Sequence, residues 1–105
     1  MGLFKKEKKP SAADLILFEE MENKDSRAAE LIEELRSGKP LVINFESISD
    51  EPQATNRLLA FLAGGTYALD GRTVKIKRYV YLFARNVDFE DGSLTEFINK
   101  FYEQE

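Results

Sequence analysis

The stretch Arg57-Leu-Leu-Ala-Phe-Leu-Ala-Gly-Gly-Thr-Tyr-Ala-Leu-Asp-Gly71 decides the fold. Its apolar residues recur at helical spacing, which predicts a buried amphipathic helix. Two adjacent glycines, Gly64 and Gly65, lie where that helix should continue, and each costs roughly 1 kcal/mol relative to alanine. Either the helix ends at the glycines, or another backbone approaches too closely for a side chain. The second alternative makes this helix a contact surface.

The composition argues against an enzyme. The chain has 105 residues, 43% of them hydrophobic and 32% charged, which suits one compact domain with a modest core. It contains no histidine and no cysteine, so it lacks disulfides, structural zinc sites and Ser-His or Cys-His nucleophilic pairs. The adjacent acidic residues lie at predicted element ends, and no phosphate-binding glycine motif is present. We therefore predict a protein without catalytic residues, cofactor or metal, in a reducing compartment such as the cytosol.

The charge distribution separates residues 1–12 from a single domain at 13–105. The net charge of −4 argues against nucleic-acid binding, and no apolar run is long enough to span a membrane. Near the N-terminus, Leu3 and Phe4 precede the basic pair Lys5 and Lys6. This segment is either a solvated tail or a short contact with an anionic membrane surface, where each lysine contributes about 1 kcal/mol.

The order of the predicted elements indicates an α/β fold. The expected elements are a strand at 14–18, a helix at 25–37, a strand at 41–45, a helix at 52–69, strands at 73–77 and 79–83, and a helix at 93–104. The continuous apolar run at 41–45 suits a strand buried on both faces. A strand-helix-strand unit favours parallel pairing with a right-handed crossover. We predict a two-layer α/β sandwich: a small mixed sheet, two main helices and a short C-terminal helix.

Basic and aromatic residues are interleaved in the last two strands. Lys75, Lys77, Tyr81 and Phe83 share a face if residues 73–83 form one strand, and they can lie side by side if a hairpin intervenes. No glycine marks a turn between the two runs, so both alternatives stay open. The aromatic residues are either core residues beside lysines that solvate a sheet edge, or part of a groove for an acidic, apolar peptide.

The central part of the chain resembles the core domain of the SepF family of bacterial cell-division factors. The resemblance covers roughly 14–89 and is most specific in 41–71, where a strand ending in Asn precedes an Arg-containing helix and Phe-Leu-x-Gly-x-x-Tyr-x-x-x-Gly. The residues that match this pattern are Asn44, Arg57, Phe61, Leu62, Gly64, Tyr67 and Gly71.

The resemblance implies a function and a set of contact residues. SepF proteins bind the C-terminal tail of FtsZ, the tubulin-like division GTPase, and form homodimers and in some cases polymers. They also tether FtsZ to the inner face of the plasma membrane at the division site. The implied peptide-binding residues are Lys75, Lys77, Tyr81, Phe83 and Phe61. The implied self-association residues are Gly64, Gly71 and Tyr67, and the implied membrane contacts are Leu3, Phe4, Lys5 and Lys6. Because the family pattern shares the first of the two adjacent glycines, the resemblance favours Gly64 over Gly65 as the point of close packing.

Two departures from the family pattern leave room for another function. The N-terminal segment before Ser11 is shorter than in the family, so any membrane contact would hold the core close to the surface. The helix at 93–104 extends past the usual end, where it either caps the sheet or reshapes the peptide site. The alternative is a non-enzymatic regulatory interaction module of the anti-sigma-antagonist type, which shares only the strand-helix alternation.

Overall fold

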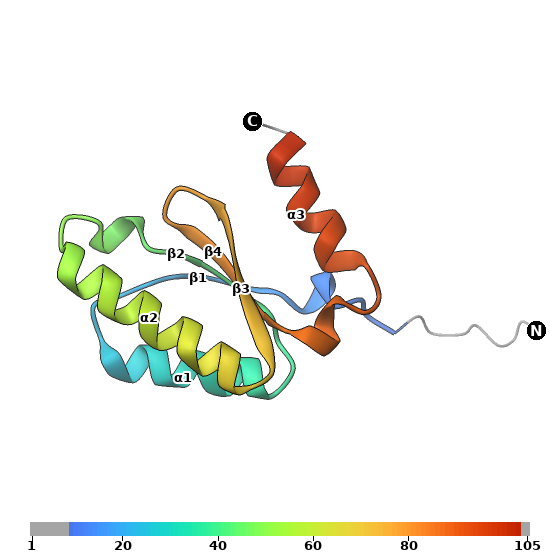
Figure 1. The fold of residues 1–105 in the computed structure, drawn as a ribbon, viewed down its shortest axis with the longest axis horizontal. Coiled ribbons are helices and arrows are strands. Elements are labelled where there is room, and N and C mark those ends of the chain that lie inside the picture. The colour runs from blue at the N-terminus through green and yellow to red at the C-terminus, as the bar shows by residue number, and fades with distance from the viewer. Residues whose placement is uncertain (1–8, 104–105) are drawn as a thin grey trace, which may run out of the picture.

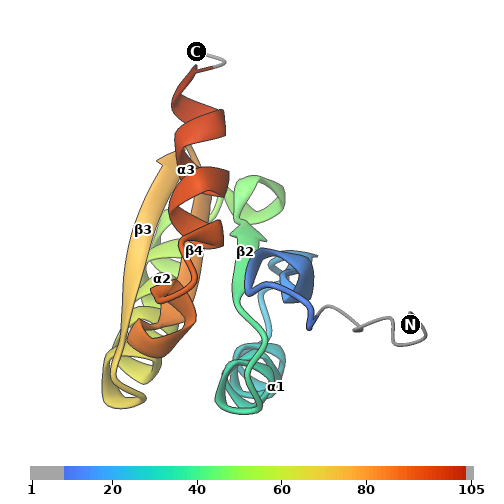
Figure 2. The same cartoon turned by 90° about the vertical axis from the view of Figure 1, so that its right-hand side faces the viewer.

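The structure, a computed structural model, describes residues 9–103 and consists of a four-stranded sheet with helices on both faces (Figures 1 and 2). The strands are β1 (Leu17–Glu20), β2 (Leu41–Asn44), β3 (Gly71–Lys77) and β4 (Val80–Arg85), and the α-helices are α1 (Asp25–Arg36), α2 (Pro52–Ala68) and α3 (Ser93–Glu103). Short 3-10 turns occupy Ala13–Leu15, Glu46–Ile48 and Asn86–Phe89.

The sheet is mixed, with the spatial order β1-β2-β4-β3. β1 and β2 are parallel, as predicted for a strand-helix-strand unit, and the other two pairs are antiparallel. α1 and α2 lie on one face, and α3 stands against the other (Figure 2). The predicted α/β sandwich is confirmed, and α3 adds a partial layer on its second face.

The first strand begins later than the sequence suggested. We expected it at 14–18, but it runs from Leu17 to Glu20. Ser11 and Asp14 explain the difference: the Ser11 amide donates to Asp14 Oδ2 at 3.0 Å, and the Asp14 amide donates to Ser11 Oγ at 3.2 Å. These reciprocal bonds stabilise a 3-10 turn at Ala13–Leu15 instead of extended backbone.

Two apolar cores share the central strands. Leu41 and Ile43 of β2 face the core under α1 and α2, whereas Val42 faces the core beneath α3, so β2 is buried on both faces as predicted. The larger core consists of Met21, Ala28, Leu31, Leu35, Leu41, Ile43, Phe45, Ile48, Leu58, Leu62 and Phe83. The smaller core consists of Ile16, Val42, Ile76, Val80, Leu82, Ala84 and Leu94.

β3 and β4 form a hairpin, which settles the alternative that the sequence left open. The turn at Arg78 and Tyr79 contains no glycine. Tyr79 adopts the left-handed conformation that a glycine would usually provide in such a turn, with φ of 68°. Its carbonyl accepts a hydrogen bond from the Phe45 amide at 2.7 Å, and its side chain packs against the larger core. These tertiary contacts compensate for a conformation that is unusual for a bulky residue.

α2 runs through both glycines to Ala68, so the glycines do not end it. Asp70 supplies the left-handed residue of the following turn, with φ of 60°. Gly71 is needed for a different reason. A Cβ at Gly71 would lie 2.5 Å from the carbonyl oxygen of Ala84 and 2.8 Å from Thr66 Cγ2.

The segment before β1 is attached to the start of α3. The Ala12 amide donates to Asp91 Oδ2 at 2.9 Å, and the Ala13 amide donates to Ser93 Oγ at 2.9 Å. The hydrogen bond from Ala12, followed by those from Ser93, lowers the pKa of the exposed Asp91 carboxyl. These bonds connect two segments that lie far apart in the sequence.

Substituting the glycines one at a time tests this account of the α2–β3 region. Gly71→Ala should lower the free energy of unfolding by about 1–3 kcal/mol, because the backbone oxygen of Ala84 cannot move aside. Gly64→Ala is the matched control, since nothing lies within 4 Å of its added Cβ. It should raise stability by about 0.5–1 kcal/mol through helix propensity. Urea denaturation at one protein concentration measures both, and equal effects would contradict the assignment.

The link between the Asp91 carboxylate and the Ala12 amide should depend on pH. Because the folded-state pKa of Asp91 is depressed, the stabilisation is present above the unfolded pKa of about 3.9 and is lost as the pH falls through the folded value. In Asp91→Ala, the Ala12 amide should exchange faster with solvent at neutral pH. Hydrogen exchange followed by NMR measures this, with Glu90→Ala as the control at a neighbouring exposed carboxylate. Unchanged protection of Ala12 in Asp91→Ala would refute the link.

Candidate functional site

The structure separates the residues predicted to bind a peptide. Strand register pairs Lys75 with Tyr81 and Thr73 with Phe83 across the hairpin, on the side of the sheet that faces α1 and α2. Phe83 is 0% exposed within the larger core. Its predicted role as a surface contact is therefore corrected to that of a core residue, in agreement with the alternative that assigned it to the core.

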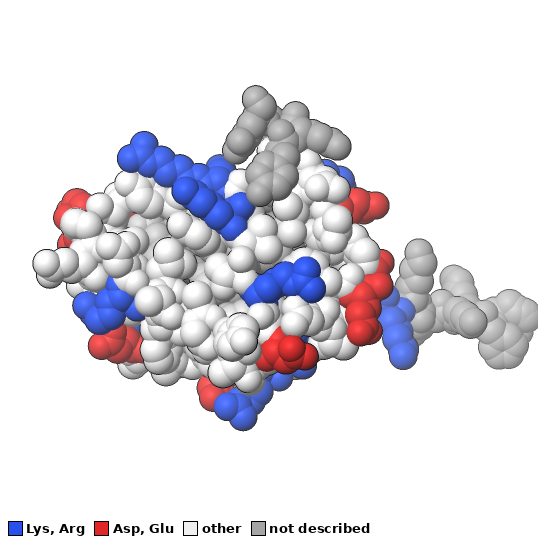
Figure 3. Space-filling view, viewed as in Figure 1, with Lys and Arg blue, Asp and Glu red and all other residues white. Residues whose placement is uncertain are grey.

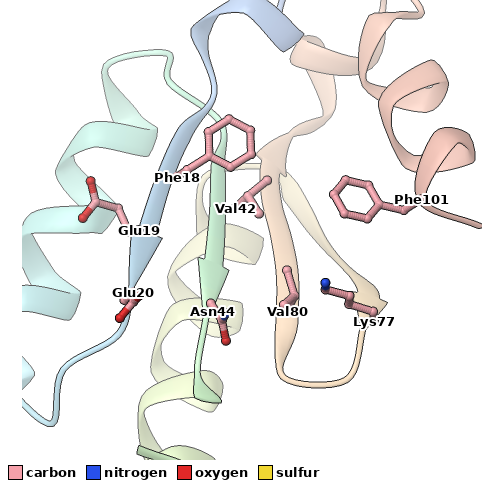
Figure 4. A pocket seen from close by; sticks show the side chains of 8 residues that line it. All are labelled: Phe18, Glu19, Glu20, Val42, Asn44, Lys77, Val80 and Phe101. Carbon is pink, nitrogen blue, oxygen red and sulfur yellow. The ribbon is translucent and has the colours of Figure 1, made fainter. Parts of the chain in front are cut away.

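Lys77 lies on the opposite face from Lys75. An irregularity between them shifts the register, so that Lys77 pairs with Val80, a residue of the smaller core. Figure 4 shows Lys77 beside Val80 and across from Phe101 of α3. Period-2 alternation alone would place the two lysines on one face, and the sequence contains no glycine to mark the irregularity.

Phe61 is 49% exposed and lies away from the hairpin. At 3.6 residues per turn, Phe61 and Gly65 share one flank of α2, and Gly65 packs against Ile32 of α1. Thr66, which contacts the Gly71 position at the start of β3, lies on the other flank. Within one protomer, Phe61 therefore does not join Lys75 and Tyr81.

A smaller surface remains, which we call the hairpin patch: Leu59, Lys75, Tyr79 and Tyr81. Leu59 lies on the β3 side of α2, and its side chain and both tyrosines pack partly exposed against the larger core. The Tyr81 ring meets the Phe45 ring edge-on, with centroids 5.8 Å apart. The Arg78 guanidinium lies 4.9 Å from the centre of the Tyr79 ring. Figure 3 shows basic side chains along this side of the molecule, above a broad face with few charges.

Sequence reasoning did not identify Leu59 as part of this patch. The apolar spacing of α2 predicted that Ala54, Leu58, Phe61 and Leu62 are buried, which is confirmed except for Phe61. The place of Leu59 depends on which flank of the helix faces β3. That orientation follows from the contact between Thr66 and the Gly71 position, which the sequence does not reveal.

The residues predicted for self-association, Gly64, Tyr67 and Gly71, do not form one surface. Tyr67 is 81% exposed, and the position of a Gly64 Cβ is open to solvent, so both belong to the outer face of α2. A Cβ at Gly65 would lie 2.6 Å from Ile32 Cδ1, so within the protomer the close packing is made by Gly65. The predicted role of Gly64 in contacts between subunits stays a prediction. Gly71 is buried, and packing within the protomer already accounts for its identity.

A pocket of about 360 Å³ opens on the other side of the sheet, between α3 and the first two strands (Figure 4). Its lining residues are Phe18, Glu19, Glu20, Val42, Asn44, Lys77, Val80 and Phe101. The Glu19 carboxylate is engaged by Arg27 at 2.6 Å, a hydrogen bond that raises the pKa of the guanidinium. We refer to this site as the α3 pocket.

The described residues offer surfaces for binding. Within residues 9–103, no group of acidic, histidine or cysteine side chains is arranged to hold a metal ion. In the same part of the chain, no helix has the length and apolarity needed to cross a membrane. The predicted membrane contacts Leu3, Phe4, Lys5 and Lys6 lie outside the described residues.

Comparison with known proteins identifies the family. The family model described as cell division protein SepF matches residues 19–88. Cell division protein SepF of Carboxydothermus hydrogenoformans is 40% identical over 70 residues, which cover 67% of this chain and 50% of the relative. Cell division protein SepF of Ruminiclostridium cellulolyticum is 38% identical over 74 residues, 70% of this chain and 46% of the relative.

The matched residues include the second half of β1, the other three strands, α1 and α2, whereas α3 follows them. The chain spans about half the length of the curated relatives that it matches. Because the family match covers more than half of the chain and agrees with the resemblance in 41–71, this chain belongs to the SepF family of cell-division proteins.

Proposed function

We propose that this chain is a division scaffold that binds the C-terminal tail of FtsZ, assembles as a homodimer or higher polymer, and holds FtsZ at the inner face of the plasma membrane. The observation that carries the proposal is the SepF match over residues 19–88. The proposed location is the cytoplasmic side of the division site.

The hairpin patch supports the peptide-binding part of this proposal. Tyr79, Tyr81 and Leu59 are partly exposed on a rigid base, because each packs against the larger core. Aromatic side chains anchored in this way are typical contributors to binding energy at interfaces. Lys75 and Arg78 add positive charge beside them, which favours an acidic peptide with apolar anchors. The patch therefore has the chemistry of a surface for a short, acidic and apolar segment.

Charge reversal at the two strand lysines tests which face binds the peptide. Lys75→Glu should weaken binding of a fluorescent FtsZ tail peptide about fivefold, the equivalent of about 1 kcal/mol for an exposed charge contact. Lys77→Glu is the matched control on the same strand, and it should leave the Kd unchanged because Lys77 faces α3. Fluorescence anisotropy provides the measurement.

Three outcomes of that titration are informative. Loss of affinity only in Lys77→Glu would move the peptide site to the α3 pocket. Equal loss in both variants would indicate general attraction to positive charge. The absence of saturable binding up to millimolar peptide would refute the peptide-binding proposal.

The outer face of α2 supports the homodimer proposal. Phe61, Gly64 and Tyr67 lie on exposed positions of this helix, with Gly64 presenting bare backbone between two aromatic residues. A second copy could approach closely at Gly64 and cover both rings. Two-fold symmetry makes such an interface self-complementary, because the same patch serves both copies.

A bulky residue at Gly64 tests the homodimer. Gly64→Leu should shift the sedimentation coefficient toward that of the monomer, because the new side chain occupies the line of closest approach. Within one protomer the position is open, so the fold should be retained. Thr95→Leu, an exposed position on α3, controls for the added apolar surface. Analytical ultracentrifugation over a range of concentrations gives the result, and an unchanged dimer would exclude Gly64 from the interface.

A further inference from the structure

The two edges of the sheet carry charges of opposite sign. β1 and β3 are the outer strands of the order β1-β2-β4-β3, so within residues 9–103 each pairs with another strand on one side only. β1 contains two acidic residues and no basic one, Glu19 and Glu20. β3 contains three basic residues and no acidic one, Arg72, Lys75 and Lys77. Each edge therefore offers backbone donors and acceptors to a further strand, beside charges of a single sign.

The charges decide which edges can pair between two copies of the chain. Two β1 edges would bring Glu19 and Glu20 against acidic residues, and two β3 edges would bring lysine against lysine. Like charges on adjacent strands are destabilising. The pairing of one β1 edge with one β3 edge is the combination in which the charges attract. It uses a different surface on each copy, so it is heterologous and repeats from head to tail.

The strand directions are compatible with this pairing. β1 runs parallel to β2, and β2 and β3 are both antiparallel to β4, so β1 and β3 run in the same direction. A second copy in the same orientation as the first would add its β1 to β3 as a parallel fifth strand. Because α1 and α2 lie on one face of the sheet, the helices of both copies would stay on that face (Figure 2).

One register brings matching side chains of the two edges together. With Phe18 beside Val74, both side chains lie on the face of α3, where each packs against that face only in part. Phe18 is 62% exposed although its ring contacts that of Phe97, and Val74 is partly buried against the smaller core. The same register places Glu19 beside Lys75, both on the face of α1 and α2.

This register also brings Glu20 of one copy to Lys77 of the next. Glu20 would lie beside Ile76, and the irregularity after Lys75 puts Lys77 on the same face as Ile76. Both charged residues are exposed, and they stand on opposite sides of the α3 pocket of their own protomer (Figure 4). Among the described residues, neither of these two side chains has a hydrogen bond or an ion pair.

We infer that copies of this chain associate head to tail, with β1 of one copy added to β3 of the next in a continuous sheet. The inference rests on the proposed function only in naming a contact for its polymer, and it is separate from FtsZ binding and from the dimer at α2. The strand β1 has four residues, so each contact is weak and assembly depends on concentration. Lys75 belongs to this edge and to the hairpin patch, so a neighbouring copy and a bound peptide compete for it.

Complementary charge reversals in the full chain test the contact. Glu20→Lys alone and Lys77→Glu alone should each lower the association constant about fivefold, because one of the paired charges then repels the other. An equimolar mixture of the two variants should recover wild-type association, since the two unchanged residues attract each other and so do the two introduced charges. Sedimentation velocity over a range of concentrations measures the species larger than a dimer, which separates this contact from the proposed dimer at α2.

The matched controls change the same charges away from the sheet edges. Glu33→Lys on α1 and Lys100→Glu on α3 are at exposed positions and should associate like the wild type. A wild-type protein that forms no species larger than a dimer would overturn the inference. A mixture of the two edge variants that associates no better than either variant alone would overturn it as well.

Introduced cysteines give a direct test, because the chain has none of its own. Within one protomer, three inter-strand steps separate β1 from β3, roughly 14 Å, so a thiol crosslinker shorter than this joins only different copies. The double variant Phe18→Cys, Val74→Cys should give a ladder of dimers, trimers and larger species. The control Phe18→Cys, Glu33→Cys should stop at dimers. Dimers alone in the test variant, or equal ladders in both, would refute the pairing of these edges.

Discussion

The close approach of the Gly71 backbone to the Ala84 carbonyl fixes the position of α2 on the sheet. The turn through Asp70 brings the chain directly from the end of α2 into β3, with Thr66 in contact with the same glycine. Because β3 then pairs with β4 from Gly71 onward, this contact also determines which hairpin residues lie beside the helix. The close contact at Gly71, where a side chain would not fit, therefore determines which residues form the hairpin patch and which side of α2 faces outward.

The two faces of the sheet have different capacities for binding. On the face covered by α1 and α2, Leu41, Ile43 and Phe83 are buried. The hairpin patch, at the edge between α2 and the hairpin, stays partly exposed. On the other face, α3 covers part of the apolar surface and leaves a pocket beside it. The register shift before Lys77 assigns one lysine to each face, so the basic residues of a single strand serve two separate surfaces.

Most of the secondary structure could be predicted because the local signals agreed with the tertiary contacts. The run at 41–45 indicated a strand buried on both faces, and the apolar spacing in α2 outweighed the cost of Gly64 and Gly65. The sequence left alternatives open where contacts between distant segments decided the outcome. Tyr79 takes a turn conformation that its sequence does not favour, because Phe45 and the core hold it there. The two glycines could not be told apart, because their roles depend on where α1 packs.

The same limit explains why the residues of the candidate site were only partly predictable. A family pattern identifies positions that recur, but it does not distinguish a residue kept for the core from one kept for a partner. Phe83 and Gly71 are explained by packing inside one protomer, whereas Tyr67 and Gly64 have no such explanation, since one is exposed and the other borders open space. An exposed aromatic residue gains little from folding when it stands alone in water, because its apolar surface stays hydrated. The outer face of α2 therefore carries an exposed aromatic ring and bare backbone that packing within one protomer does not account for.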